Sequence, residues 1–174
     1  TARYMLPLAL GHLLWRHHHV RNEGGAVPFQ TFLIDLNDLF ERSIAACLRD
    51  RLQGSDITVA RQHRIHLDAN GLETAAIDVL LLHRGSPVLA LDTKYKHYMG
   101  RPKREDLNQM FAYCHALRIP RGILLYPHGH PLRDTRHLQG ATIEAWGIDL
   151  GGSVKVLEER LGCLADELAA TVAK

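Results

Sequence analysis

Long apolar runs are missing from this sequence of 174 residues, and cysteine is scarce. No apolar stretch approaches the roughly 18 residues that a membrane helix needs, so we expect no membrane span. The three cysteines, Cys47, Cys114 and Cys163, are odd in number and far apart. They exclude a four-cysteine zinc or iron–sulfur site within this chain and favour reduced thiols in a cytoplasmic protein.

Three signals that would point to other functions are also missing. No stretch with basic, apolar and small-residue regions opens the chain, so a secretory signal is not expected. The phosphate-binding loop Gly-x-x-x-x-Gly-Lys-Ser/Thr is absent, so a P-loop NTPase is not expected in this chain. A nucleophile elbow is absent too, which disfavours a Ser/His/Asp hydrolase. The first residue is Thr1 rather than Met, which is compatible with a fragment of a longer protein.

What is present is an ordinary globular composition with unevenly distributed charge. Hydrophobic residues make up 46% and charged residues 23%, and a net charge of +2 does not by itself indicate nucleic-acid binding. Two basic stretches stand out, namely Lys94, Lys96, His97, Arg101, Lys103 and Arg104, and then His128, His130, Arg133, Arg136 and His137. Each alone is typical of a solvated loop. Because both follow predicted strands that could end at one site, phosphate binding is the alternative interpretation.

Hydrophobic periodicity predicts one mixed α/β domain over residues 1–174, with the order α-α-β-β-β-α-β-β-α. Helices are expected at 2–19, about 36–52 with Asp35 as N-cap, about 105–118 and 155–173, and 20–31 is predicted as a loop. Strands are expected at 57–67, 74–83, 87–95, 121–126 and 141–149, the first three as a β-meander. This divides the domain into a helical lead-in and loop (1–31), a core (32–126) and a C-terminal strand and helix (127–174).

Two of the predicted strands each carry one acidic residue, Asp78 or Asp92, inside an apolar run. A carboxylate in such a run is costly to bury unless it is paired or binds a metal. A turn separates the two, which fits a hairpin in which both carboxylates approach the same ion. Mg²⁺ needs only one or two protein carboxylates, since water and phosphate fill the other positions. The backbone carbonyl of Thr93 is a further candidate ligand.

Four other residues are candidates for the same site. Lys94 follows Asp92 by two positions, so on a strand both side chains leave from one face, where a lysine can orient a metal-bound water and stabilise charge on a phosphate. Glu41 flanks the apolar face of its helix, as either an exposed residue or a third acid that holds such a water. Gln109 and Tyr113 share a helix face, as either a polar flank or a pair that contacts Lys94, the water or a phosphate.

Four short sequence runs follow one another along the chain. They are Leu36-Asn37-Asp38-Leu39-Phe40-Glu41, Ile77-Asp78, Leu91-Asp92-Thr93-Lys94-Tyr95-Lys96 and Asp106-Leu107-Asn108-Gln109-Met110-Phe111-Ala112-Tyr113. Together they resemble the McrC-type subunit of 5-methylcytosine restriction systems, which carries a nuclease domain of the PD-(D/E)xK superfamily. The resemblance runs from about Phe32 to Tyr126, which would be the catalytic core. One departure is Ile77, which stands where a proline often precedes the first acid.

The resemblance implies a restriction-endonuclease-like mixed β-sheet flanked by helices, with Asp78 and Asp92 as metal ligands and Lys94 as the catalytic lysine. Glu41 would be the helix acid that acts on the metal through water, and Gln109 with Tyr113 the downstream Q-x-x-x-Y pair. Mg²⁺ is the implied cofactor, with Mn²⁺ as a substitute. The implied partner is an AAA+ GTPase of the McrB type, which would bind through a region not in this chain.

We therefore predict a Mg²⁺-dependent DNA endonuclease domain of a modification-dependent restriction system. The residues predicted to bind DNA are Lys96, Arg101, Lys103 and Arg104. Two alternatives stay open, namely a DNA-binding or assembly module that keeps the fold without cutting, and a repair or recombination nuclease of the same superfamily. A homodimer is compatible with double-strand cleavage, which usually needs two active sites, although no particular residue indicates one.

Overall fold

The computed structural model describes residues 20–21, 30–31, 35–68 and 70–172, and the chain divides into two compact units, 1–39 and 40–174. In the first unit, strands β1 (Val20–Arg21) and β2 (Gln30–Thr31) pair antiparallel. The prediction of a loop over 20–31 is therefore wrong at both ends, because strands of two residues are too short to show an alternating pattern. The helix predicted at 2–19 lies outside the described residues.

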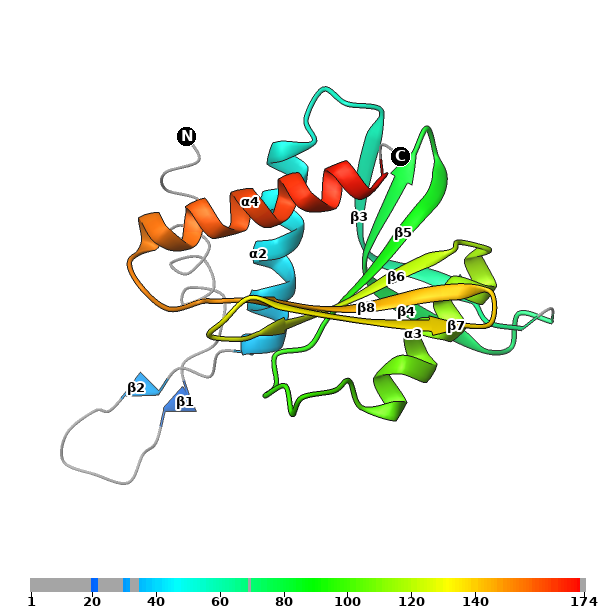
Figure 1. Cartoon of the computed structure of the whole chain (residues 1–174), viewed down its shortest axis with the longest axis horizontal. Helices are drawn as coiled ribbons and strands as arrows, with labels where there is room; N and C mark the ends of the chain where they lie inside the picture. Colours follow the sequence, from blue (N-terminus) through cyan, green and yellow to red (C-terminus); the bar gives the residue numbers. More distant parts are fainter. Residues whose placement is uncertain (1–19, 22–29, 32–34, 69, 173–174) are drawn as a thin grey trace. The chain divides into compact units, whose positions relative to one another are not determined.

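The second unit is built on a six-stranded mixed sheet with the order β3-β4-β5-β6-β8-β7 (Figure 1). Its strands are β3 (Ile57–His66), β4 (Thr74–His83), β5 (Ser86–Thr93), β6 (Arg121–Pro127), β7 (Leu132–Leu138) and β8 (Ala141–Ile148). The first three form the predicted antiparallel meander. Strand β6 pairs in parallel with both β5 and β8, and β7 is antiparallel to β8. The parallel β5–β6 pair needs a crossover, which helix α3 (Arg104–Leu117) supplies.

Helices cover both faces of this sheet. Apolar residues of α2 (Leu36–Arg51) and α4 (Val154–Val172), such as Ile44 and Leu168, share one core with one side of the sheet, and α3 packs through Met110 on the other side (Figure 1). The predicted N-cap of α2 is confirmed, because Asp35 Oδ1 accepts hydrogen bonds from the backbone N–H groups of Asn37 at 2.9 Å and Asp38 at 3.3 Å. No helix in the described ranges combines the length and the apolar character that a bilayer crossing requires.

Strand β7 is the one element of the sheet that the sequence pattern does not predict. It forms inside the second basic stretch, at the edge of the sheet, and most of its residues are exposed. An edge strand with no buried face has no apolar alternation, so its sequence is like that of a solvated loop. The order in the second unit is therefore α2-β3-β4-β5-α3-β6-β7-β8-α4, with one strand more than predicted.

Candidate active site

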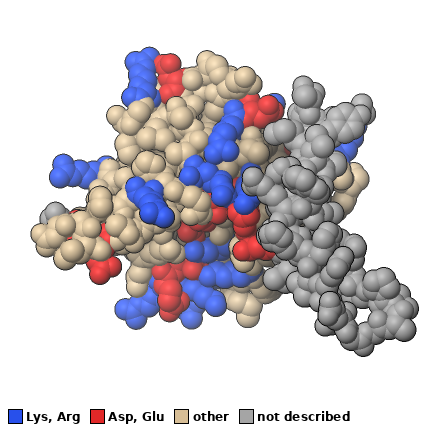
Figure 2. Space-filling view, turned by 180° about the vertical axis from the view of Figure 1, so that it is seen from behind, with Lys and Arg blue, Asp and Glu red and all other residues tan. Residues whose placement is uncertain are grey.

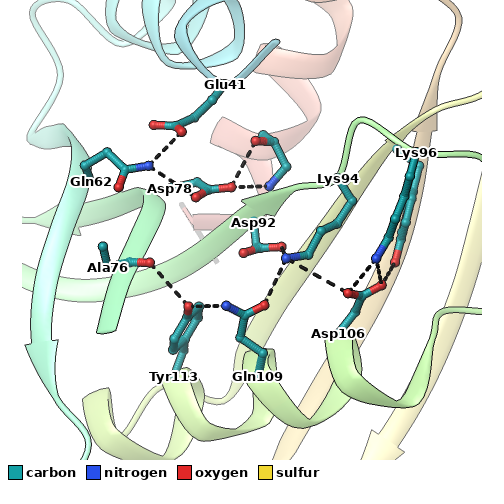
Figure 3. Close-up of polar contacts among 12 residues, drawn as sticks. Glu41, Gln62, Ala76, Asp78, Asp92, Lys94, Lys96, Asp106, Gln109 and Tyr113 are labelled. Carbon is teal, nitrogen blue, oxygen red and sulfur yellow. Dashed lines mark hydrogen bonds and ion pairs between the residues drawn. The ribbon is translucent and has the colours of Figure 1, made fainter. Parts of the chain in front are cut away.

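Asp78 and Asp92 lie on neighbouring strands at the same level of the sheet. Val79 and Leu91 are paired partners of β4 and β5, and the two aspartates are the next residues beyond this pair. Asp78 Oδ2 accepts two hydrogen bonds from Thr93, one from the backbone N at 2.8 Å and one from Oγ1 at 3.0 Å (Figure 3). The structure thus brings together the two acids and the threonine that the sequence selected.

At the level of Asp78, strands β3 and β4 twist so that the side chains before and after this point face opposite sides of the sheet. Ile77 packs in the core under α3, whereas Val79 packs in the core under α2 and α4, although residues two apart on a regular strand share a face. At this level of β3, Gln62 has the left-handed backbone angle φ = 51°, which is uncommon for a residue with a side chain. Asp78 therefore lies between a residue that faces α3 and a residue that faces α2 and α4.

Gln62 links the helix acid to the first strand acid. Its Nε2 donates a hydrogen bond of 2.7 Å to Glu41 Oε2 and a longer one of 3.4 Å to Asp78 Oδ1 (Figure 3). Glu41 is only 6% exposed, and Arg61 Nη1 lies 3.2 Å from its Oε1. The alternative of an exposed helix glutamate is therefore wrong. Sequence reasoning missed Gln62, since a glutamine within an alternating polar strand carries no distinguishing signal.

The left-handed backbone at Gln62 leads to a stability prediction. In both Gln62→Ala and Gln62→Gly the amide contacts are lost, but only glycine relieves the backbone strain, which costs about 1 kcal/mol. We expect the free energy of unfolding of Gln62→Gly to exceed that of Gln62→Ala by about 1 kcal/mol in urea titrations. The control pair is Arg64→Gly and Arg64→Ala, at an exposed residue of the same strand that has no positive φ. There the alanine variant should have the higher free energy of unfolding. An equal or more stable Gln62→Ala would contradict this explanation.

Lys94 is held by groups from β5 and α3. Its Nζ lies 2.6 Å from Asp92 Oδ2 and donates a hydrogen bond of 2.9 Å to Gln109 Oε1. Gln109 Nε2 in turn donates to the Tyr113 hydroxyl at 2.7 Å, and that hydroxyl donates to the backbone carbonyl of Ala76 on β4 at 3.3 Å (Figure 3). The sequence leaves open what the Gln109–Tyr113 pair contacts, and in the structure Gln109 contacts Lys94.

The electrostatics of the two aspartates suit a cation. Asp92 is 3% exposed, and its burial, together with the negative charge of Asp78, raises its pKa to about 6 despite the opposing effect of Lys94. A divalent cation would relieve this excess of negative charge. Among the described residues there is no group of three or more His, Cys, Asp or Glu side chains placed to hold a metal. The pair of aspartates offers carboxylate oxygens, which are the donor type that Mg²⁺ takes in proteins.

Asp106 is a second residue that sequence reasoning missed. It lies in the first turn of α3 and is 5% exposed, and its carboxylate contacts Lys96, which we predicted as a DNA-binding residue. The same carboxylate lies 4.0 Å from Lys94 Nζ. An acid in the first turn of a helix is common, so the sequence gives no sign that this one is buried.

The other predicted DNA-binding residues lie together beside the start of α3. Arg101, Lys103 and Arg104 line an open cavity of about 680 Å³. Arg136 of β7 lines it too, so the structure joins the two basic stretches of the sequence there. Arg133, from the same stretch, instead packs on the Trp146 ring at 4.1 Å. Figure 2 shows acidic and basic side chains interleaved over the middle of one face, so the cations are placed locally rather than as one uniform patch.

The fold and this arrangement define a class of protein: a mixed α/β protein in which a six-stranded sheet flanked by helices carries an acidic site with a lysine. A family model, the McrBC 5-methylcytosine restriction system component, matches residues 1–127. The match covers more than half of the chain, and the chain belongs to this family.

A solved structure supports the same fold. It is described as a refined half-complex from the tetradecameric assembly of Thermococcus gammatolerans McrB AAA+ hexamers with bound McrC. The similarity covers 96% of the present chain and 39% of that chain, with a TM-score of 0.64 and 19% sequence identity. At this identity the likeness shows the fold alone. No curated protein matches the chain.

Proposed function

We propose that this chain is the nuclease domain of a modification-dependent restriction system and hydrolyses DNA phosphodiester bonds with Mg²⁺. The observation that carries the proposal is the convergence of Asp78, Asp92 and Lys94 at the C-terminal end of β5, beside the middle of β4. Membership of the McrBC family supports the biological setting. The raised pKa of Asp92 supports a site that is completed by a cation.

The site residues divide the work of hydrolysis. Asp78 and Asp92 would hold Mg²⁺, with the Thr93 carbonyl as a further oxygen ligand. Mn²⁺ could replace Mg²⁺ at this site. When bound, the ion supplies charge neutralisation and a more acidic water. Glu41, fixed by Gln62, would orient the attacking water from the α2 side.

Lys94 faces the site from the other side. Its ammonium group can stabilise the negative charge that develops on the phosphate during attack. Gln109 and Tyr113 contact no reacting atom in this scheme. They hold Lys94 through the chain of hydrogen bonds that ends on Ala76, so the ammonium group is positioned before DNA arrives.

DNA would bind along the cationic cavity beside α3. Arg101, Lys103, Arg104 and Arg136 can neutralise backbone phosphates there, and exposed Met99 offers an apolar contact at the rim. These contacts carry no sequence information, so any preference for modified DNA would come from another part of the system. We propose that an AAA+ GTPase of the McrB type delivers the DNA. The solved complex of McrB hexamers with McrC supports such a partner.

The cavity leads to a prediction about salt. Each arginine that contacts a phosphate releases a counterion, so Arg101→Gln and Arg136→Gln should each lower the slope of log Kd against log salt by about one. Arg84→Gln is the control, because Arg84 is exposed, pairs with Asp56 and lies outside the cavity. Fluorescence anisotropy with a labelled duplex in EDTA measures the slopes. Slopes that stay equal to wild type in both cavity variants would show that DNA does not bind there.

The proposed activity is tested by incubating the protein with supercoiled plasmid that contains 5-methylcytosine. We expect nicked or linear product with Mg²⁺ or Mn²⁺ and none with EDTA. The assay is run with the chain alone and with an AAA+ GTPase partner present. Intact plasmid under all these conditions, together with retained DNA binding, would instead support the alternative of a DNA-binding or assembly module.

A further inference from the structure

Asp106 carries a buried negative charge that the mechanism above does not use. Its Oδ1 accepts a hydrogen bond of 2.8 Å from Lys96 Nζ, and its Oδ2 lies 2.7 Å from the same nitrogen. Tyr126, from β6, donates its hydroxyl hydrogen to Oδ2 at 3.1 Å. Lys94 Nζ lies 4.0 Å from Oδ1. The Asp106 carboxylate therefore pairs with Lys96, lies near Lys94 and accepts a hydrogen bond from Tyr126.

The surroundings hold this carboxylate in place. Asp106 lies in the first turn of α3, where the helix dipole favours an anion. Burial and the charge of Asp106 raise the pKa of Tyr126, so its hydroxyl stays protonated and remains a donor. A buried carboxylate without partners would be strongly destabilising, and the two lysines offset that cost.

Asp106 also determines how far apart the two ammonium groups can be. Lys94 Nζ and Lys96 Nζ lie 4.0 Å and 2.8 Å from the same oxygen, so their separation cannot exceed the sum of these distances. Lys94 is shared between Asp92 and Asp106, which gives an alternating row of acid, base, acid and base (Figure 3). If Asp92 binds a cation, Asp106 is the carboxylate that remains for Lys94.

An ammonium group has three N–H donors, and Asp106 does not occupy all of them. Lys94 directs one donor to Gln109 and one to Asp92, and a cation bound by Asp92 would free the second of these, while Lys96 keeps a side chain that is 34% exposed. Both can therefore keep a donor for a ligand while Asp106 restrains the side chains.

We propose that Asp106 is a positioning residue of this site, whose buried carboxylate holds the ammonium groups of Lys94 and Lys96 side by side to contact neighbouring phosphates of one DNA strand. The restraint of the lysines follows from the contacts of Asp106 alone. The role toward DNA rests on the proposed nuclease function. The simpler alternative is that Asp106 only supports the fold by pairing with Lys96.

The first test observes the lysines directly by ¹⁵N–¹H NMR of their NH₃⁺ groups, in EDTA and without DNA. Slow-exchanging signals are expected for both, assigned by their loss in Lys94→Met and Lys96→Met. Asp106→Asn keeps the size of the side chain and an acceptor for Tyr126. It should broaden or abolish the Lys96 signal and should shift or broaden the Lys94 signal, because Asp92 and Gln109 also contact Lys94. An unchanged Lys94 signal would overturn the proposal, because Asp106 would then restrain Lys96 alone. If Asp106→Asn does not fold, Tyr126→Phe replaces it and should weaken the same two signals.

The second test measures steady-state DNA cleavage. Asp106→Asn should lower kcat about ten- to a hundred-fold, as misplaced catalytic groups do, without raising KM, since one negative charge is removed near DNA. Asp106→Glu should recover part of kcat. Asp56→Asn, which breaks an exposed ion pair with Arg84, is the control and should keep the wild-type kcat.

A double-mutant cycle on kcat tests whether Asp106 acts on cleavage through Lys96. In a Lys96→Met background, Asp106→Asn should cost clearly less than in wild type, because one of its two targets is already gone. Equal losses in both backgrounds, or a kcat equal to wild type, would overturn the role toward DNA. If wild type itself does not cleave, the proposed nuclease function fails, and the NMR result still decides whether Asp106 positions the two lysines.

Discussion

Asp92→Asn is expected to lower Mg²⁺-dependent DNA cleavage by about a thousand-fold or more, as removal of a central electrostatic group does in other enzymes. Asparagine keeps the shape of the side chain but cannot hold a divalent cation together with Asp78. It also removes the anion that lies 2.6 Å from Lys94 Nζ. Initial rates on supercoiled DNA, at saturating Mg²⁺, measure the loss.

Two controls make this result specific to the site. Asp56→Asn removes an exposed carboxylate paired with Arg84 and should cleave at the wild-type rate. Asp92→Asn should still bind duplex DNA in EDTA at least as tightly as wild type, since one negative charge is gone. Cleavage by Asp92→Asn within a few-fold of wild type would remove Asp92 from the mechanism.

The same substitution should make the metal-free protein more stable at neutral pH. The pKa of Asp92 is about 6 in the folded protein, against 3.8 for an unperturbed aspartate, so the folded state binds its proton more tightly than the unfolded state. This raised pKa contributes stability at low pH that is lost as the pH rises from about 4 to about 6. At pH 7, Asp92→Asn should therefore exceed wild type by about 2 to 3 kcal/mol in free energy of unfolding.

Urea titrations in EDTA between pH 4.5 and 7.5 check this difference. The gap between variant and wild type should be small at the acid end and should widen toward pH 6. At pH 7, Mg²⁺ should stabilise wild type and not Asp92→Asn, because the proposed site needs both aspartates to bind the ion in the folded state. A gap that does not depend on pH would mean that Asp92 is not strained by its burial and by the charge of Asp78.

The site residues that could be predicted are those marked by a pattern within a short stretch of the sequence. Asp78 and Asp92 stand out because an acid in an apolar strand is rare, and a spacing of two positions places Lys94 on the face of Asp92. Gln109 and Tyr113 follow from helical periodicity. Each of these inferences uses only the period of one element or the turn of one hairpin, and in each case the structure places the residues close together as expected.

The residues that sequence reasoning missed depend on contacts between distant elements. Gln62 meets Glu41 and Asp78 only because β3 and β4 twist there, and no local pattern marks a left-handed backbone at a glutamine. Asp106 is buried where Tyr126 of β6 and the lysines that follow β5 meet the first turn of α3. Strand β7 has no buried face of its own, so its pairing with β8 could not be inferred from its composition.

The most direct test of the central claim is a calorimetric titration of Mg²⁺ or Mn²⁺ into the metal-free protein, paired with plasmid cleavage by the same preparation. The account predicts metal binding by wild type, cleavage that depends on the metal concentration in the same range, and loss of both in Asp92→Asn. A protein that binds DNA but neither binds the metal nor cuts the plasmid, alone or with an AAA+ GTPase partner, would contradict it.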